Sequence, residues 1–266
     1  MPLSKRVVYL RDFAKEADKL RNSWGSTGLY STGHIELDKY LGGGIGRKDG
    51  YEIVLLYGDT GLGKSTIALN MLKTPIIQEK KVGLLVLEDA GEDVFLRMEK
   101  VLGQTSFDKY VYHTDNIHFM PQEDLVKSWV LDDLIELIRE WFVDRDLDII
   151  LLDHLQFAFE GAESIKGENE YAAQRVFMQK LNQLMKDVKK TIILVSHINK
   201  SAASKGMSKI VGSGSIAQAG TKVIEISDDS MEDVIRLHLR KSRFTKRREY
   251  HYCMKLVDGV MRSAAE

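Results

Sequence analysis

The chain has 266 residues, 44% of them hydrophobic, and a formal net charge of −1. This length suits one α/β domain with a short extension, and the charge excludes binding to nucleic acid through a uniformly basic surface. The sequence contains no apolar run of about 18 residues, the length that would predict a membrane span. Residues 1–6 lack the apolar core of a secretory signal. The single cysteine, Cys253, excludes an intrachain disulfide and favours a reducing, cytoplasmic compartment.

Residues 5–24 form the first predicted element, an amphipathic helix. Its apolar residues recur at spacings of three and four, with charges between them: Val7, Leu10, Phe13, Ala14, Ala17, Leu20 and Trp24. A Gly/Ser-containing segment follows, so we expect a helix and hinge over 1–28 and the main domain over 29–266. From these residues alone, the helix could pack on its own domain or on a neighbouring subunit.

A P-loop pattern, G-x-x-x-x-G-K-[ST], follows at residues 58–65. The apolar run 52–57 predicts a buried strand before it, and residues 66–72 predict a helix after it, as this loop requires. Lys64 is expected to reach the β- and γ-phosphates and Ser65 to ligate Mg²⁺. The sequence therefore predicts binding of ATP, or another nucleoside triphosphate, with Mg²⁺. The expected nucleotide-binding residues are Gly58, Asp59, Thr60, Gly61, Leu62, Gly63, Lys64, Ser65 and Thr66.

Strands and helices alternate along most of the chain. After a short helix over 35–41, strands are predicted over 51–57, 82–87, 117–120, 148–153, 191–196, 221–227 and 234–241. Helices are predicted near 65–73, 92–102, 123–142 and 168–189. This order predicts an α/β fold whose mostly parallel central sheet is covered on both faces. Segments 234–241 and 249–257 predict an antiparallel hairpin at the sheet edge, and 158–169 and 198–214 predict long loops.

Polar residues end three of the predicted strands. Asp153 is expected to hold Mg²⁺ through water, and Glu88 to act as the base that polarises the attacking water. His197 is the candidate sensor of the γ-phosphate. The C-terminal ends of parallel strands line one crevice, so we expect these residues to face Lys64. The adjacent Asp89 is predicted to cap the following helix instead.

These motifs together resemble those of the RecA-fold ring helicases of the DnaB superfamily. Segment 81–89 is similar to the stretch that carries the catalytic glutamate in phage primase-helicases. Segment 151–157 shares Asp-His with the phage enzymes and Leu-Gln-Phe with the mitochondrial Twinkle helicase. Segments 212–218 and 241–244 are similar to the Gly-Ser-Gly segment and the Lys-x-Arg finger of the family. The resemblance extends from about Ser31 onward.

The resemblance implies a RecA-like replicative helicase motor that forms a hexameric ring and moves along single-stranded DNA. It implies that Arg243, with Lys241, completes a neighbour's catalytic site, and that the helix over 5–24 is a linker helix on the adjacent subunit. Loops 158–169 and 198–214 would grip the DNA strand. Their basic residues are Lys166, Lys200, Lys205 and Lys209, although a solvated surface would also account for them. Primase or other replisome proteins are further implied partners, in a phage or bacterial-type nucleoid.

Two other functions fit the same residues. One is a RecA-fold recombinase or loader, which forms filaments or rings without unwinding DNA. The other is an ATP-gated assembly switch whose slow hydrolysis times association. Strand displacement distinguishes the helicase from both, and DNA-stimulated hydrolysis distinguishes the two DNA-bound classes from the switch.

Overall fold

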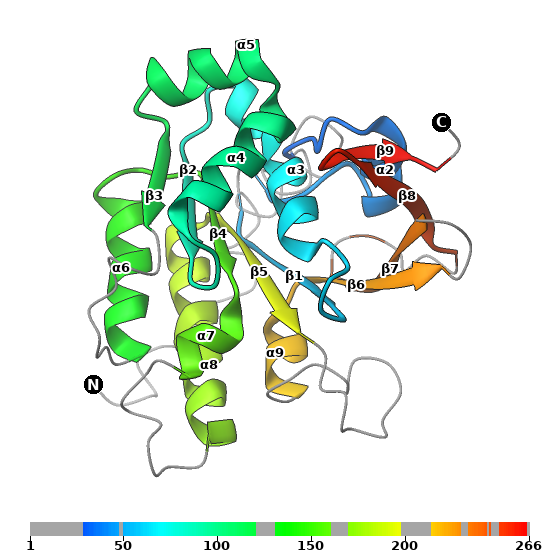
Figure 1. Cartoon of the computed structure of the whole chain (residues 1–266). Coiled ribbons are helices and arrows are strands. Elements are labelled where there is room, and N and C mark those ends of the chain that lie inside the picture. Colours follow the sequence, from blue (N-terminus) through cyan, green and yellow to red (C-terminus); the bar gives the residue numbers. More distant parts are fainter. Residues whose placement is uncertain are drawn as a thin grey trace, which may run out of the picture.

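In the computed structural model, one nine-stranded sheet organises the described part of the chain (Figure 1). The described residues are 29–47, 50–120, 131–160, 170–197, 214–229, 234–243, 245 and 250–264. The strand order is β3-β2-β4-β5-β1-β6-β7-β8-β9. Strands β3 to β6 in this order are parallel, and β7, β8 and β9 are each antiparallel to their neighbours. The predicted α/β class with a mostly parallel sheet is confirmed.

The parallel strands lie within two residues of their predicted bounds. They are β1 (Glu52–Gly58), β2 (Val82–Val86), β3 (Ile117–Met120), β4 (Ile149–Asp153), β5 (Thr191–His197) and β6 (Lys222–Asp229). Every residue of β1, β2 and β4 is buried, which explains why these strands are almost continuously apolar in sequence.

The antiparallel part contains one strand more than predicted. The expected hairpin is confirmed as β7 (Val234–Ser242) and β8 (Tyr252–Val257), but β9 (Val260–Ser263) forms the actual sheet edge. Asp258 and Gly259 connect β8 to β9 with φ angles of 52° and 82°. An Asp-Gly pair between apolar segments is a strong hairpin signal, so the sequence did contain the information that predicts β9.

Helices cover the two faces of the sheet in separate layers (Figure 1). One layer holds α2 (Ile35–Leu41), α3 (Lys64–Ile77), α4 (Gly91–Leu102), α5 (Gln104–Phe107) and the π-helix η4 (Asp108–Tyr112). The other holds α6 (Leu131–Val143), α7 (Leu155–Glu160), α8 (Glu170–Val188) and α9 (Gly214–Ala219). Alternate β1 residues enter opposite cores: Val54 and Leu56 pack in the first, and Ile53 and Leu55 in the second.

Two helices correct the sequence-based bounds. Helix α3 continues to Ile77, four residues past the predicted end, because Pro75 and Ile76 are buried and their packing outweighs the backbone donor that proline lacks. The predicted loop 158–169 begins within α7, whose Leu155, Ala158 and Phe159 pack in the second core. Residues 161–169 of this loop, residues 198–213 of the other, and residues 121–130 before α6 lie outside the described residues.

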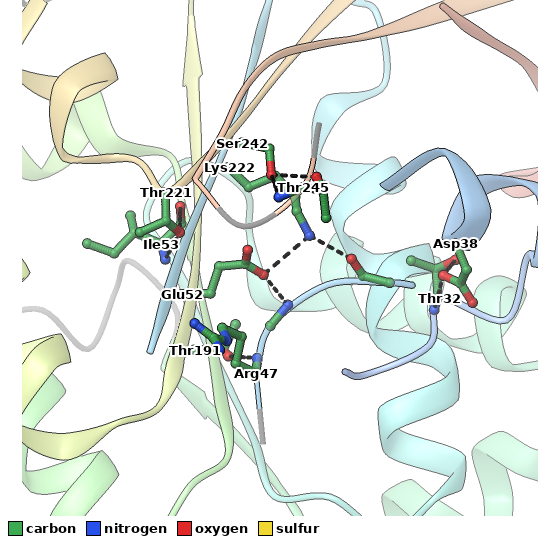
Figure 2. A network of polar contacts seen from close by, with 12 residues as sticks. Thr32, Asp38, Arg47, Glu52, Ile53, Thr191, Thr221, Lys222, Ser242 and Thr245 are labelled. Carbon is green, nitrogen blue, oxygen red and sulfur yellow. Dashed lines mark hydrogen bonds and ion pairs between the residues drawn. The ribbon is translucent and has the colours of Figure 1, made fainter. Parts of the chain in front are cut away.

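Buried polar contacts fix the glycine-rich segment before β1 to the strand starts (Figure 2). Lys222 and Glu52 form a buried ion pair at 3.4 Å, and Lys222 also donates to the Gly44 carbonyl at 2.7 Å. Glu52 accepts a hydrogen bond from the Gly46 backbone N–H. Because each charge has a partner, the ion pair can be buried here. This network lies at the end of the sheet opposite to the P-loop.

The predicted N-terminal helix and hinge, residues 1–28, lie outside the described residues. The division into this unit and a domain over 29–266 therefore stays a prediction. Among the helices that the structure describes, none has the length and apolar character needed to cross a membrane.

Candidate active site at the strand ends

The P-loop connects β1 to α3 in the geometry that phosphate binding requires. Gly58 ends β1, where a Cβ atom would lie 2.3 Å from the Ile226 carbonyl oxygen, so only glycine fits. Gly63 is the N-cap of α3 and has a φ angle of 71°, which favours glycine. The first backbone N–H groups of α3 are therefore available to a phosphate. Lys64 donates to the Asp59 carbonyl at 2.7 Å, so its ammonium lies against the loop.

Asp153 lies beside this loop at the end of β4. Its side chain is buried and forms a hydrogen bond with Ser65, while its Oδ1 atom has no partner among the described residues. Burial raises the pKa of Asp153 to about 6; Ser65 opposes the shift, and the charges of Asp89 and Glu88 add to it. A carboxylate and a hydroxyl are ligand types that Mg²⁺ accepts, so Asp153 and Ser65 fit a magnesium site.

Glu88 follows β2, the strand next to β4. Val86 pairs with Asp153 in the parallel register, which brings the ends of the two strands together. The Glu88 Oε2 atom lies 3.6 Å from His154 Nδ1 and 3.8 Å from His197 Nε2. On its other side, His197 Nδ1 lies 3.3 Å from the Thr60 hydroxyl of the P-loop. The structure thus brings the candidate base and the candidate sensor into one group beside the P-loop.

Three residues at this site were not predicted. His154 follows Asp153 and is buried; its ring centroid lies 3.8 Å from that of His197. Gln156 donates to the Ser196 hydroxyl at 2.8 Å and accepts from the His197 backbone N–H at 3.3 Å, which connects α7 to β5. The third, Arg97, is described below with Asp89. The sequence signals for the first two were their position directly after the Asp153 strand and the family resemblance of segment 151–157, which assigned them no role.

The prediction that Asp89 caps the next helix is wrong. Ala90 is the N-cap of α4, with no side-chain hydrogen bond, and Asp89 instead pairs with Arg97 of that helix. Arg97 lies on α4, whereas Asp89 precedes the helix by two residues. This hydrogen bond, with the charges of Asp89 and Asp153, raises the pKa of Arg97. Arg97 therefore adds a fixed positive charge close to two carboxylates of the site.

Arg243 and Lys241 lie far from this group. Ser242 pairs with Lys222 at the start of β6, and the Arg243 N–H donates to the Thr221 carbonyl. The Lys241 ammonium donates to the Ala217 and Gln218 carbonyls of α9, and Arg243 donates to the Gln218 carbonyl at 3.0 Å. Burial, and secondarily the charge of Arg243, lowers the pKa of Lys241.

The four lysines predicted to contact DNA all lie outside the described residues. They are Lys166, Lys200, Lys205 and Lys209. The described chain stops at His197, at the nucleotide end of β5, and continues from Gly214 at the start of α9. The segment that carries three of these lysines therefore begins directly after the candidate sensor.

The buried Asp153 makes the stability of the metal-free protein dependent on pH. Its pKa is higher in the folded state than in the unfolded chain. The protonated side chain therefore contributes fully to the free energy of unfolding below about pH 4, and this contribution is lost as the pH rises through 6. Asp153→Asn should therefore raise the free energy of unfolding at pH 8, without Mg²⁺ or nucleotide, by on the order of 2 kcal/mol. Urea unfolding at pH 8 and pH 4 measures this. An equal difference between variant and wild type at both pH values would contradict it.

The comparisons with known proteins match the part of the chain that contains this site. The AAA domain family (AAA_25) matches residues 46–203, from the segment before β1 to the one after β5. DNA repair protein RadA of Chlamydia pneumoniae is 24% identical over 173 residues, which cover 65% of this chain and 33% of that protein. RadA of Campylobacter jejuni is 25% identical over 178 residues, covering 66% and 34%. The chain spans about a third of the length of these relatives.

Similar solved structures include a DnaB-like replicative helicase described with its interactions with primase. It has a TM-score of 0.69 and 13% identity, covering 96% of this chain and 66% of that one. A separately solved ATPase domain gives a TM-score of 0.72 at 13% identity, covering 94% and 96%. A KaiC-like protein from Pyrococcus horikoshii OT3 gives 0.65 at 19% identity, covering 87% and 96%. The predicted resemblance is confirmed at the level of the fold: the chain belongs to the AAA domain family and has the RecA-like ATPase fold of DnaB-type helicases.

Proposed function

We propose that this chain is the motor domain of a replicative DNA helicase, an ATP hydrolase that works as a hexameric ring on single-stranded DNA. The observation that carries the proposal is the separation between Arg243 and the P-loop. Arg243 is next to Thr221, level with Ile53 on β1, whereas the P-loop begins at Gly58. Along the strand direction this separation is roughly 16 Å at the usual rise per residue of a β-strand, and the distance between the strands adds to it. An arginine there is available to a second subunit.

Each residue at the strand ends has a separate role in the proposed hydrolysis reaction. Lys64 and the α3 N-terminus bind the phosphates, while Ser65 and Asp153 hold Mg²⁺, which would neutralise phosphate charge. Glu88 accepts a hydrogen bond, or a proton, from the attacking water. His197 contacts Thr60 of the P-loop on one side and Glu88 on the other, so it is suited to sense the γ-phosphate. Arg243 and Lys241 would stabilise transition-state charge in the neighbouring site.

The contacts around His197 support a coupling between the nucleotide bound at the P-loop and the contacts with DNA. Gln156 contacts both Ser196 and the His197 backbone, so these hydrogen bonds join α7 and the end of β5 into one unit. The two segments that continue from this unit are 161–169 and 198–213. These segments carry the proposed DNA contacts Lys166, Lys200, Lys205 and Lys209. In addition, α9 receives the Lys241 and Arg243 hydrogen bonds, which would connect the loop over 198–213 to the subunit interface.

Changing Lys205 and Lys209 to Ala tests the DNA contact. Each lost phosphate contact on a single strand should reduce the salt slope of log K by about 0.7, so the double variant should lose about 1.4. Fluorescence anisotropy with a labelled oligonucleotide over a range of salt concentrations measures this slope. ATP hydrolysis without DNA should be unchanged.

The matched control removes two exposed lysines from helices away from the loop, Lys100 of α4 and Lys186 of α8. Their change to Ala alters net charge equally but should leave the salt slope at the wild-type value. A wild-type slope in the Lys205/Lys209 variant, or an equal loss in the control, would exclude this loop as the DNA contact.

A RecA-fold recombinase or loader is the second candidate. It is favoured by the similarity to DNA repair protein RadA. Such an ATPase would use the same P-loop, Glu88 and Asp153, and would bind DNA without separating its strands. We propose a cytoplasmic, nucleoid-associated location for either candidate, whereas interaction with primase or other replisome proteins belongs to the helicase proposal. Strand displacement on a forked duplex therefore distinguishes the two.

A further inference from the structure

Glu88, His154 and His197 form a compact group of three possible metal ligands at the sheet end. One ligand atom from each residue lies within 4.8 Å of the other two. The two distances from Glu88 Oε2 to the imidazole nitrogens are 3.6 and 3.8 Å. Ligand atoms around a tetrahedral ion with bonds of about 2.1 Å lie roughly 3.4 Å apart, so small side-chain adjustments would bring all three into coordination.

The buried side chain of His154 is the independent observation that points to a ligand. Only 3% of the residue is exposed, and neither imidazole nitrogen has a hydrogen-bond partner among the described residues. A buried polar group without a partner is costly, so such a group in a folded protein calls for an explanation. A metal ion bound at an imidazole nitrogen would supply the missing partner.

The neighbouring residues orient the other imidazole in the way metal sites do. His197 Nδ1 lies 3.3 Å from the Thr60 hydroxyl, and its Nε2 faces Glu88. In metal sites a hydrogen bond at one ring nitrogen fixes the tautomer and the orientation of the ring. Two imidazoles and one carboxylate suit first-row transition ions, whereas the oxygen ligands Ser65 and Asp153 suit Mg²⁺.

We propose that Glu88, His154 and His197 form a second metal site, which takes a divalent transition ion of the Zn²⁺ or Co²⁺ type in preference to Mg²⁺. An ion bound there engages the carboxylate of Glu88, which then cannot position the attacking water. Occupancy therefore inhibits ATP hydrolysis while the P-loop still binds nucleotide. The inhibition depends on the proposed role of Glu88 as the base, but the binding of the ion does not.

Binding is tested by titrating Co²⁺ into the nucleotide-free protein in a large excess of Mg²⁺. The d–d absorption of Co²⁺ reports its ligands directly, so the readout does not depend on activity. The wild type should take up one Co²⁺ per chain at this site, and Zn²⁺ should displace it. Glu88→Gln keeps the side-chain volume nearly constant, and His154→Asn replaces the imidazole with a smaller amide; each should weaken binding by about 10-fold or more. Circular dichroism confirms that each variant is folded.

Two control variants remove candidate ligands elsewhere in the chain. His251→Asn alters the His238–His251 pair, whose rings lie 5.2 Å apart, and Cys253→Ser removes the only thiol. Both controls should bind Co²⁺ as the wild type does. Failure of the wild type to bind Co²⁺, or unchanged binding in both His154→Asn and Glu88→Gln, would overturn the proposal.

Zn²⁺ inhibition of ATP hydrolysis tests the consequence. The concentration that halves wild-type turnover should rise about 10-fold or more in His154→Asn, at fixed excess Mg²⁺. Equal sensitivity of wild type and His154→Asn would overturn the inhibitory role. If Co²⁺ binds as expected but Glu88→Gln hydrolyses ATP normally, the metal site stands and the assignment of Glu88 as the base fails.

Discussion

Replacing Glu88 with Gln should lower ATP turnover by about 10²-fold or more while ATP binding is retained. Glu88 follows β2, next to Asp153 and close to the P-loop. Its carboxylate can accept a hydrogen bond from a water molecule there. Glutamine has nearly the same size but is a poor proton acceptor, so the phosphate-binding residues keep their positions. Steady-state hydrolysis and equilibrium binding of a fluorescent ATP analogue separate the two effects. Lys64→Ala, in contrast, should weaken binding and turnover together.

Asp89→Asn is the matched control for this experiment. Asp89 is the adjacent carboxylate, but its side chain is paired with Arg97. Its replacement should reduce turnover far less than Glu88→Gln does. Hydrolysis at the parental rate in Glu88→Gln would mean that the base is elsewhere, with Asp89 or an acid from a neighbouring subunit as the next candidate.

Replacing Arg243 with Ala should lower turnover on the order of 10³-fold, as expected for an arginine finger supplied by a neighbour. The Arg243 guanidinium contacts the Gln218 carbonyl at the end of the sheet opposite to its own P-loop, so an effect within one chain has no direct route. ATP binding should persist, because the P-loop is unchanged. Arg175→Ala, which removes an exposed arginine of α8, should leave turnover at the wild-type rate.

Mixing two inactive variants tests whether the finger acts between subunits. Lys64→Ala disables the P-loop and leaves Arg243 intact, whereas Arg243→Ala does the reverse. Mixed rings contain interfaces where an intact P-loop meets an intact finger, so activity should return as the variants are combined. Subunit exchange is followed independently by energy transfer between labelled chains. Exchange without any recovered hydrolysis would contradict the assignment in trans.

The parallel half of the fold was predictable because its signals are local. Buried strands such as β1 and β4 are continuous apolar runs, and the P-loop has a fixed pattern. The order of strand ends along one edge then follows from the parallel topology, which is why Asp153, Glu88 and His197 were expected together. Even β9 had a local signal in Asp258-Gly259.

The site contained features that depend on contacts between distant residues. Nothing in the sequence around His154 indicates that it is buried against His197, which lies on another strand. Similarly, Asp89 was expected to cap α4 because it precedes that helix, but the pairing with Arg97 depends on the orientation of α4. Gln156 gains its role only through its contacts with β5. Such contacts are set by packing, which periodicity and spacing do not specify.

Strand displacement from a forked DNA duplex is the measurement that tests the motor proposal most directly. A fork labelled with a fluorophore and a quencher should show ATP-dependent separation by the wild type, and Glu88→Gln should bind the fork without separating it. DNA-stimulated hydrolysis without strand separation would contradict the helicase proposal and favour a recombinase or loader. Hydrolysis that DNA does not stimulate, again without separation, would contradict it in favour of an ATP-gated assembly switch.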